Sequence, residues 1–254
     1  MKAFLAFTGK EFTEYIRTYK LFILLIVFMI FGFLSPITAK YLPQIFEMAG
    51  LDPAAMGMGD PTAADSFAQF FKNVGQMGLL VVVIIFSGIM ANEFSKGTLV
   101  NMLTKGLKRP IVILSKWVSS VLCWTVAYLL CLGISYGYTA FYFEIEGYQN
   151  MFAAFLALWL YGVLLLVLVI LGGTLFKNVY GSLLLTGGVA VVLTLLNLVP
   201  SFQKYNPASL ASDSLALITA QKGLDDLLPA FILCGAAILI LTAASILIFN
   251  KKQI

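Results

Sequence analysis

Residues 151–176 read MFAAFLALWLYGVLLLVLVILGGTLF, an unbroken apolar run without a charged side chain. The hydrocarbon core of a bilayer is about 30 Å thick, and a helix needs about 20 mostly apolar residues to cross it. This stretch therefore predicts a transmembrane helix.

The same character recurs along the chain. The segments predicted to span a membrane are residues 21–42, 73–91, 115–143, 151–176, 182–200 and 228–249. Within them only Lys40 and Lys116 are charged, and both lie close to an end. A central charge costs about 2.5–3.5 kcal/mol on insertion scales, so true spans should lack one. A buried soluble bundle is disfavoured, because its helices would need polar outer faces.

Composition agrees with this interpretation. The 254 residues are 61% hydrophobic and 11% charged, whereas soluble domains have about 45–50% apolar and about 25% charged residues. We expect an all-α polytopic membrane protein with a single transmembrane domain over residues 1–254. Residues 1–20, MKAFLAFTGKEFTEYIRTYK, place aromatic and charged residues at roughly helical spacing, which predicts an interfacial elbow helix. The alternative is that they only begin the first span.

The basic residues predict the orientation. If the N-terminus is cytoplasmic, six spans place both termini inside, and twelve of the 16 Lys and Arg residues lie on the cytoplasmic side. The four on the outer side are Lys40, Lys72, Lys204 and Lys222. This is a positive-inside distribution. It explains the net charge of +4 without any binding of nucleic acid.

Two insertions are expected on the outer side, over residues 43–72 and 201–227. In the first, Asp60 can N-cap a helix that has Pro61 at its first position. That helix should be a short surface or re-entrant segment leading into the second span.

In the second insertion, Asn206 can likewise N-cap a short helix that has Pro207 at its first position. Gly223 is a candidate to end that helix. Asp225 and Asp226 should then lie at the N-terminus of the last span, where the helix dipole favours acidic side chains.

The residues offer no chemistry of their own. The chain has no histidine, which excludes Ser–His and Cys–His catalysis. Cys123, Cys131 and Cys234 all lie in expected spans and are interpreted as packing residues. No GxxxxGK[ST] motif occurs, so we expect no catalytic residue, no metal ligand and no nucleotide or other cofactor site in this chain.

Two polar residues within the spans are candidates to line a substrate path: Gln76 and Asn197. The alternative is that they hydrogen-bond neighbouring helices, as most such residues do. Gly133 and Gly137 form a small-xxx-small pair in the third span, a spacing that permits close approach of another helix.

The connector over residues 92–114 is the most informative loop. Glu93 ends the second span, a short apolar helix follows, and Arg109-Pro110 begins the next helix. The positive-inside rule explains the basic residues of this loop. It does not explain its apolar residues, which need to be buried against a partner that this chain does not supply: Phe94, Leu99, Met102 and Leu103. We hypothesise that Glu93 pairs with Lys116 or Arg109 across the loop.

These residues resemble the first cytoplasmic loop of ABC type-2 exporter permeases, the stand-alone six-helix membrane subunits. The pattern is E-x3-GT-x4-L, a basic turn and a Lys opening the next helix. It falls here on Glu93, Gly97-Thr98, Leu103, Lys108-Arg109-Pro110 and Lys116. Family members often carry Ser before the Arg, where this chain has Lys108.

The resemblance implies a homodimer of permeases in the inner (plasma) membrane of a bacterium, paired with two copies of a separate ABC ATPase that binds ATP and Mg. Residues 94–104 would form a coupling helix docked on the ATPase, with the elbow beside it. The implied coupling residues are Glu93, Phe94, Gly97, Thr98, Leu99, Met102, Leu103, Arg109 and Lys116. The substrate route would lie at the dimer interface, bounded by the first, second and fifth spans.

Other classes of function fit these residues less well. An ATP-independent channel or secondary transporter would normally carry intramembrane ionisable residues, which the spans lack. An intramembrane enzyme would need a nucleophile and a base. The apolar spans favour an amphipathic peptide, a drug or a lipid-like molecule as substrate.

Overall fold

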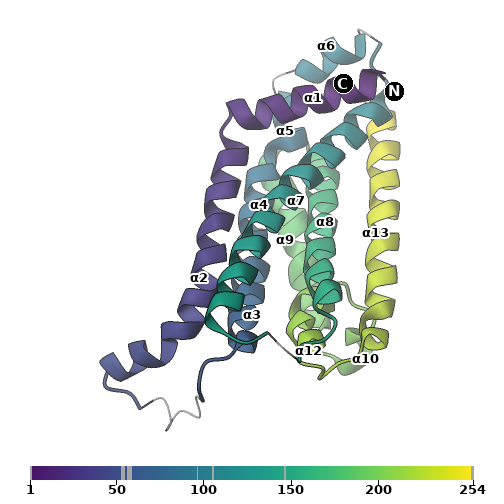
Figure 1. Ribbon diagram of the computed structural model, residues 1–254. Helices are drawn as coiled ribbons and strands as arrows, with labels where there is room; N and C mark the ends of the chain where they lie inside the picture. Colours follow the sequence, from purple (N-terminus) through teal and green to yellow (C-terminus); the bar gives the residue numbers. More distant parts are fainter. Residues whose placement is uncertain are drawn as a thin grey trace.

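The computed structural model describes residues 2–52, 55, 59–95, 97–104, 106–145 and 147–252. In this part of the chain every regular element is a helix. Figure 1 shows a bundle of long helices with both chain termini at one end. We call this end the terminal end of the bundle, and the opposite one the far end.

Six helices among the described residues are long and apolar enough to cross a membrane. They are α2 (Lys20–Met48), the helical run Ala63–Ser95, α7 (Arg109–Tyr142), α8 (Met151–Phe176), α9 (Val179–Leu196) and α13 (Leu224–Lys251). The predicted all-α fold with six apolar spans is confirmed. The fourth span begins and ends at the predicted residues, whereas the third extends back to Arg109, inside the expected loop.

The second span differs most from the prediction. It consists of α3 (Ala63–Lys72), the π-helix η1 (Asn73–Gly78), α4 (Leu79–Phe86) and α5 (Gly88–Ser95), which follow one another in a single rod. Of the expected outer insertion over residues 43–72, residues 43–48 continue α2 as a helix. The helix predicted after Asp60-Pro61 is α3, which leads into the second span as expected.

The N-cap of this rod also differs from the prediction. Asp65 Oδ2 accepts hydrogen bonds from the Thr62 backbone N–H at 2.8 Å and from Thr62 Oγ1 at 2.7 Å. Thr62, not Asp60, is the capping residue. In this capping box the Asp65 carboxylate accepts the backbone N–H of Thr62, which has no partner within the helix. A lone Asp before a proline lacks this reciprocal contact.

Helix α8 lies at the centre of the bundle. It packs against α4, α5, α7, α9 and α13, and residues 161–174 are all buried. A helix that is apolar on every side can be buried only if other helices surround it. The sequence of this span permits its central position but does not determine it, since α2 and α13 are nearly as apolar and lie mostly at the surface of the bundle.

Glycines permit the closest helix contacts. A Cβ placed on Gly162 of α8 would lie 2.6 Å from the Trp124 indole of α7, so only glycine fits beneath that ring. The Trp124 N–H donates to the carbonyl of Trp159 at 3.1 Å. In contrast, a Cβ on Gly133 or Gly137 would meet no atom within 4 Å. Within the described chain this pair mediates no close helix approach.

The far end is covered by short helices: α10 (Pro200–Gln203), α11 (Ser209–Ser212) and α12 (Ser214–Ile218). The helix predicted after Asn206-Pro207 is thus present as two short pieces, and Asn206 Oδ1 accepts the Ala208 N–H at 3.0 Å. Gly223 does not end a helix but N-caps α13, with its N–H donating to Asp226 Oδ2 at 3.0 Å. Asp225 and Asp226 lie in the first turn of α13, as predicted.

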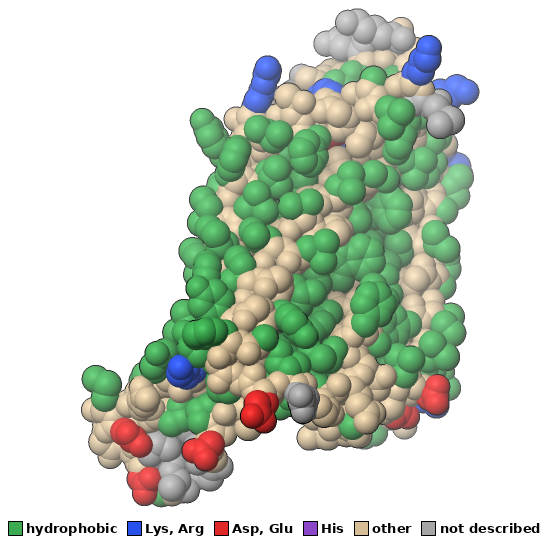
Figure 2. All heavy atoms as spheres, viewed as in Figure 1, with side chains coloured by type: hydrophobic (Ala, Val, Ile, Leu, Met, Phe, Trp, Pro, Cys, Tyr) green, Lys and Arg blue, Asp and Glu red, His purple; other side chains and the backbone are tan. Residues whose placement is uncertain are grey.

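The charges are distributed unevenly along the bundle. On the face shown in Figure 2, Lys and Arg side chains gather mainly at the terminal end, and acidic side chains gather at the far end. Apolar side chains cover the surface between them. This is the pattern that a bilayer requires of a polytopic protein.

Candidate functional site

Helix α1 (Lys2–Arg17) lies across the terminal end of the bundle (Figure 1). The chain turns between α1 and α2 at Tyr19, whose φ of 59° is in the left-handed region. The buried side chains of α1 are Phe7, Glu11 and Tyr15, spaced by one helical turn. The predicted N-terminal helix is present, and one face of it is packed against the bundle.

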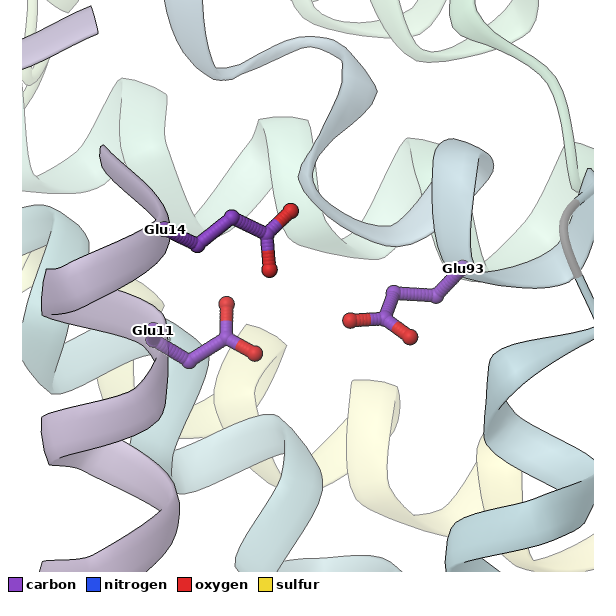
Figure 3. A group of neighbouring side chains, drawn as sticks. All are labelled: Glu11, Glu14 and Glu93. Atoms are coloured by element: carbon purple, nitrogen blue, oxygen red, sulfur yellow. The ribbon is translucent and has the colours of Figure 1, made fainter. Parts of the chain in front are cut away.

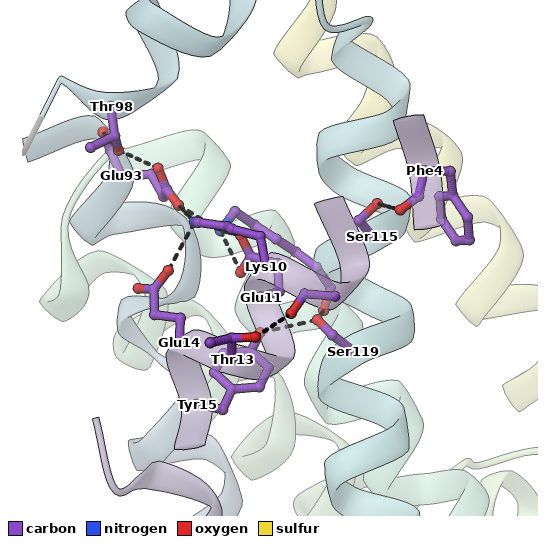
Figure 4. A network of polar contacts seen from close by, with 12 residues as sticks. Phe4, Lys10, Glu11, Thr13, Glu14, Tyr15, Glu93, Thr98, Ser115 and Ser119 are labelled. Carbon is purple, nitrogen blue, oxygen red and sulfur yellow. Dashed lines mark hydrogen bonds and ion pairs between the residues drawn. The ribbon is translucent and has the colours of Figure 1, made fainter. Parts of the chain in front are cut away.

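A buried ionic network joins α1 to the second and third spans (Figure 4). Lys116 Nζ on α7 lies 2.9 Å from both carboxylate oxygens of Glu11 and 3.1 Å from Glu93 Oε1 at the end of α5. Lys116 and Glu11 are each 1% exposed and Glu93 is 5% exposed. Because desolvated charges are tolerated only when paired, this network holds three helices in one arrangement.

Lys10 extends the network toward solvent. Its Nζ lies 3.0 Å from Glu11 Oε1, 2.8 Å from Glu14 Oε2 and 2.8 Å from Glu93 Oε1. Burial acts to lower the pKa of the Lys10 ammonium, but the hydrogen bonds to Glu14 and Glu93 outweigh it and hold that pKa above its ordinary value. Lys10 therefore stays charged at neutral pH.

The three glutamates point toward one another, as Figure 3 shows. One carboxylate oxygen from each lies within 4.8 Å of the others, a spacing that would suit a metal ion. However, Lys10 contacts all three carboxylates and Lys116 contacts two of them. Two ammonium groups thus already supply the positive charge that a cation would bring, and the geometry fits an ion-pair network.

Glu93 also shapes the turn into α6 (Thr98–Thr104). The Thr98 hydroxyl donates to Glu93 Oε2 and to the Glu93 carbonyl. Gly97 has a φ of +64°, a conformation that glycine adopts without strain. The E-x3-GT pattern therefore has a local structural reason, since its acid caps the turn that its glycine and threonine form.

Arg109 takes no part in this network. Its Nη1 donates to the carbonyls of Phe249 and Lys252 at 2.6 Å and of Asn250 at 3.2 Å. It therefore caps the C-terminal end of α13, where a cation is favoured by the helix dipole. Of the two partners hypothesised for Glu93, Lys116 is confirmed and Arg109 is wrong.

The apolar residues of the loop are mostly covered by the chain itself. Leu99 is fully buried, and the Phe94 ring packs edge-on against Phe249 with centroids 6.1 Å apart. The prediction that this set needs a partner outside the chain is wrong for Leu99, whereas Phe94 is half-buried. Met102 and Leu103 are half-buried and remain partly accessible on α6.

Gln76 and Asn197 lie on one cavity of about 810 Å³ between the second and fifth spans. The second and fifth spans line it together with α8, and no described residue of the first span lines it. Asn197 is held by hydrogen bonds, since its Nδ2 donates to Ser212 Oγ at 2.9 Å and its Oδ1 accepts from Asn206 at 3.2 Å. Gln76 is exposed.

Glu11 is the functional residue that sequence reasoning missed. An interfacial elbow helix over residues 1–20 would place its charged side chains, Glu11 among them, in water. The signal was present, because Glu11 lies one turn from both Phe7 and Tyr15, on the apolar face. An acid at such a position is buried with the face and needs a basic partner.

No family model matches this chain. The sequence is similar to the uncharacterized transmembrane protein YxlG of Bacillus subtilis (strain 168), with 26% identity over 218 residues that cover 84% of each protein. With the six apolar helices, this similarity makes the chain a multi-pass membrane protein.

Proposed function

We propose that this chain is the membrane subunit of an ATP-driven exporter of the ABC type-2 class. In this proposal two copies pair in a bacterial inner membrane with two copies of a separate ATPase, which binds ATP and Mg. The terminal end faces the cytoplasm, as the basic residues gathered there favour.

The observation that carries the proposal is the network around Glu93. This one carboxylate contacts Lys116 on α7, Lys10 on α1 and Thr98 on α6. A displacement of α6 by a soluble partner would therefore move the second span, the third span and α1 together. A transport subunit without its own ATP site needs such a rigid connection between its docking surface and its spans.

The docking surface in this proposal is narrower than the loop sequence suggests. Glu93, Gly97, Thr98 and Lys116 transmit the motion, and Arg109 secures the neighbouring end of α13. Met102 and Leu103 on α6 are the apolar residues left to contact the ATPase. Closure of the ATPase pair on ATP would press on α6 and tilt the spans, which alternates access to the substrate route.

Reconstitution tests the proposal. The chain is co-expressed with the ABC ATPases of its source genome, and the purified complex is assayed for ATP hydrolysis in proteoliposomes. We expect one ATPase to co-purify in equal amount and Glu93→Gln to uncouple hydrolysis from transport. Glu14→Gln is the matched control, because Glu14 contacts Lys10 but neither Lys116 nor Thr98.

If no ATPase associates, or if transport runs at full rate without ATP, the chain is a channel or secondary transporter instead. If the complex forms but Glu93→Gln and Glu14→Gln behave alike, the role of Glu93 in coupling is wrong.

A further inference from the structure

The cavity of about 810 Å³ is an elongated site with one polar end and one apolar end. Its walls are η1 and α4 on one side and α9 on the other, with α8 behind and α11 and α12 at the far end. Its volume lies within the range of about 300–1,000 Å³ that small-molecule sites occupy.

The polar groups of the cavity gather toward the far end. Lys72 and Gln76 line it from the second span, and Asn197 and Ser212 line it from the end of the fifth span and from α11. Thr186 and Thr194 also line it, but their hydroxyls donate to carbonyls of α9 itself. Lys72 is the one charged residue among the described residues that line the cavity, and no carboxylate lines it. The nearby Asp213 carboxylate is paired with Lys222 at 2.6 Å. A cavity with one cation and no acid is complementary to an anionic group.

Below these groups the lining becomes apolar. It comprises Leu79, Leu80, Val83, Ile84, Leu165, Leu183, Ala190 and Val191. From Lys72 to Ile84 the second span advances about 18 Å at a helical rise of 1.5 Å per residue. The cavity therefore extends about 18 Å from Lys72 to its apolar end between α4 and α9, a length that suits an extended hydrocarbon chain with a charged head.

The π-helix η1 lies at the junction of the two parts. It includes Gln76 and follows Lys72 directly. Single π-turns within α-helices are rare and occur frequently at functional sites, because they redirect side chains at some cost in hydrogen-bond geometry. Here the irregular turn coincides with the polar end of the cavity.

We propose that this cavity binds a single-chain amphiphile with an anionic head group. The head lies between Lys72 and Gln76 at the far end, and the chain lies along α4 and α9. That this ligand is the exported substrate rests on the proposed function.

The test uses the isolated chain in phosphatidylcholine nanodiscs, with binding measured by native mass spectrometry. The probes are lysophosphatidylglycerol, lysophosphatidylcholine of the same chain length, and two-chain phosphatidylglycerol. A charge-assisted contact from Lys72 should make lysophosphatidylglycerol bind about tenfold tighter than lysophosphatidylcholine. Two-chain phosphatidylglycerol should bind more weakly than the single-chain probe.

Two matched pairs of variants locate the site. Gly187 lines the cavity and Gly188 does not, and a Cβ on either meets no atom within 4 Å. Gly187→Phe should therefore weaken lysophosphatidylglycerol binding by about tenfold or more, while Gly188→Phe leaves it unchanged. Lys72→Gln should abolish the preference for the anionic head, and Lys204→Gln, which removes another exposed far-end charge, should retain it.

Equal binding of the two lysolipids, or equal effects of the two glycine variants, would overturn the inference. Tighter binding of two-chain phosphatidylglycerol would overturn it as well, because it would indicate a site for a membrane lipid. A second copy of the chain could also fill the cavity. In that case Gly187→Phe would dissociate a dimer without changing lipid binding, which also overturns it.

Failure of this inference is distinguishable from failure of the proposed function. Binding to the isolated chain needs no ATPase, so it persists if no ATPase associates. If an ATPase couples normally but lysophosphatidylglycerol does not bind, only the inference fails.

Discussion

Lys116 Nζ lies 2.9 Å from both carboxylate oxygens of Glu11, although the two residues are 105 positions apart and each is 1% exposed. The contact ties an N-terminal helix that lies across the bundle to the beginning of the third span. A buried pair of this kind adds little stability over an apolar pair of the same volume, but breaking it is costly. The arrangement therefore fixes the position of α1 more than it stabilises the fold.

Lys116→Met should destabilise the protein by up to about 3–5 kcal/mol, the usual cost of removing one partner of a buried ion pair, because Lys10 alone would then balance both Glu11 and Glu93. Thermal unfolding in nanodiscs measures the loss. Adding Glu11→Gln to this variant removes one of the two buried carboxylates that lost Lys116, and it should recover part of the stability. If the double variant is less stable than Lys116→Met, the buried charge is not the cause.

Glu93→Gln should loosen the connection between α5 and α6. The neutral amide keeps the shape of the side chain but weakens the contacts to Lys10, Lys116 and Thr98. We expect limited trypsin digestion within residues 95–108 to become faster. Glu14→Gln should leave the digestion unchanged, because a partly exposed ion pair contributes only about 0–1 kcal/mol. Equal digestion of both variants would argue against the capping role of Glu93.

The spans were predictable because a bilayer imposes length and apolarity on each helix, and the 151–176 segment meets both without ambiguity. The first and last residues of the spans were harder to predict. Residues 63–72 carry Asp65 and Lys72, which suggests a surface segment, yet Phe67 and Phe70 bury one face of it against the bundle. The sequence predicts that this helix leads into the second span, as α3 does, but periodicity does not show that the π-helix η1 joins α3 to α4.

The site was predictable where its residues are local. Glu93, Gly97 and Thr98 form one turn, so their spacing carries the information. The contacts of Glu11 and of Arg109 are long-range, and nothing in the spacing of the chain specifies that one pairs with Lys116 and the other caps α13. The burial of Leu99 depends on the packing of the whole terminal end in the same way.

Arg109→Ala should release the last turn of α13. Three carbonyls at the end of that helix would lose a charged donor. A hydrogen bond to a charged group contributes about 1.5–3 kcal/mol to stability. Hydrogen–deuterium exchange should increase over residues 246–252. Lys108→Ala removes the same charge from the adjacent exposed position and should leave that exchange unaltered. Exchange that rises equally in both variants would indicate a general charge effect.

Gly162→Ala should be destabilising, because its Cβ would overlap the Trp124 indole. Forcing extra volume into a packed interior costs about 1–3 kcal/mol. Gly137→Ala has open space around the new methyl group, and replacing glycine by alanine within a helix gains up to about 1 kcal/mol. Unfolding in nanodiscs should move in opposite directions for the two variants. A destabilised Gly137→Ala would reveal a contact with another subunit at that face.

Leu99→Asp and Leu103→Asp should separate folding from partner binding. Leu99 is fully buried within the chain, so an unpaired carboxylate there carries the full desolvation penalty and should prevent accumulation of folded protein. Leu103 is half-buried on α6, where a carboxylate can reach water. Leu103→Asp should therefore fold, as judged by gel filtration and thermal unfolding, but lose the co-purifying ATPase. If Leu103→Asp retains the ATPase at wild-type affinity, α6 is not the docking surface, and the partner contact must be sought on α1.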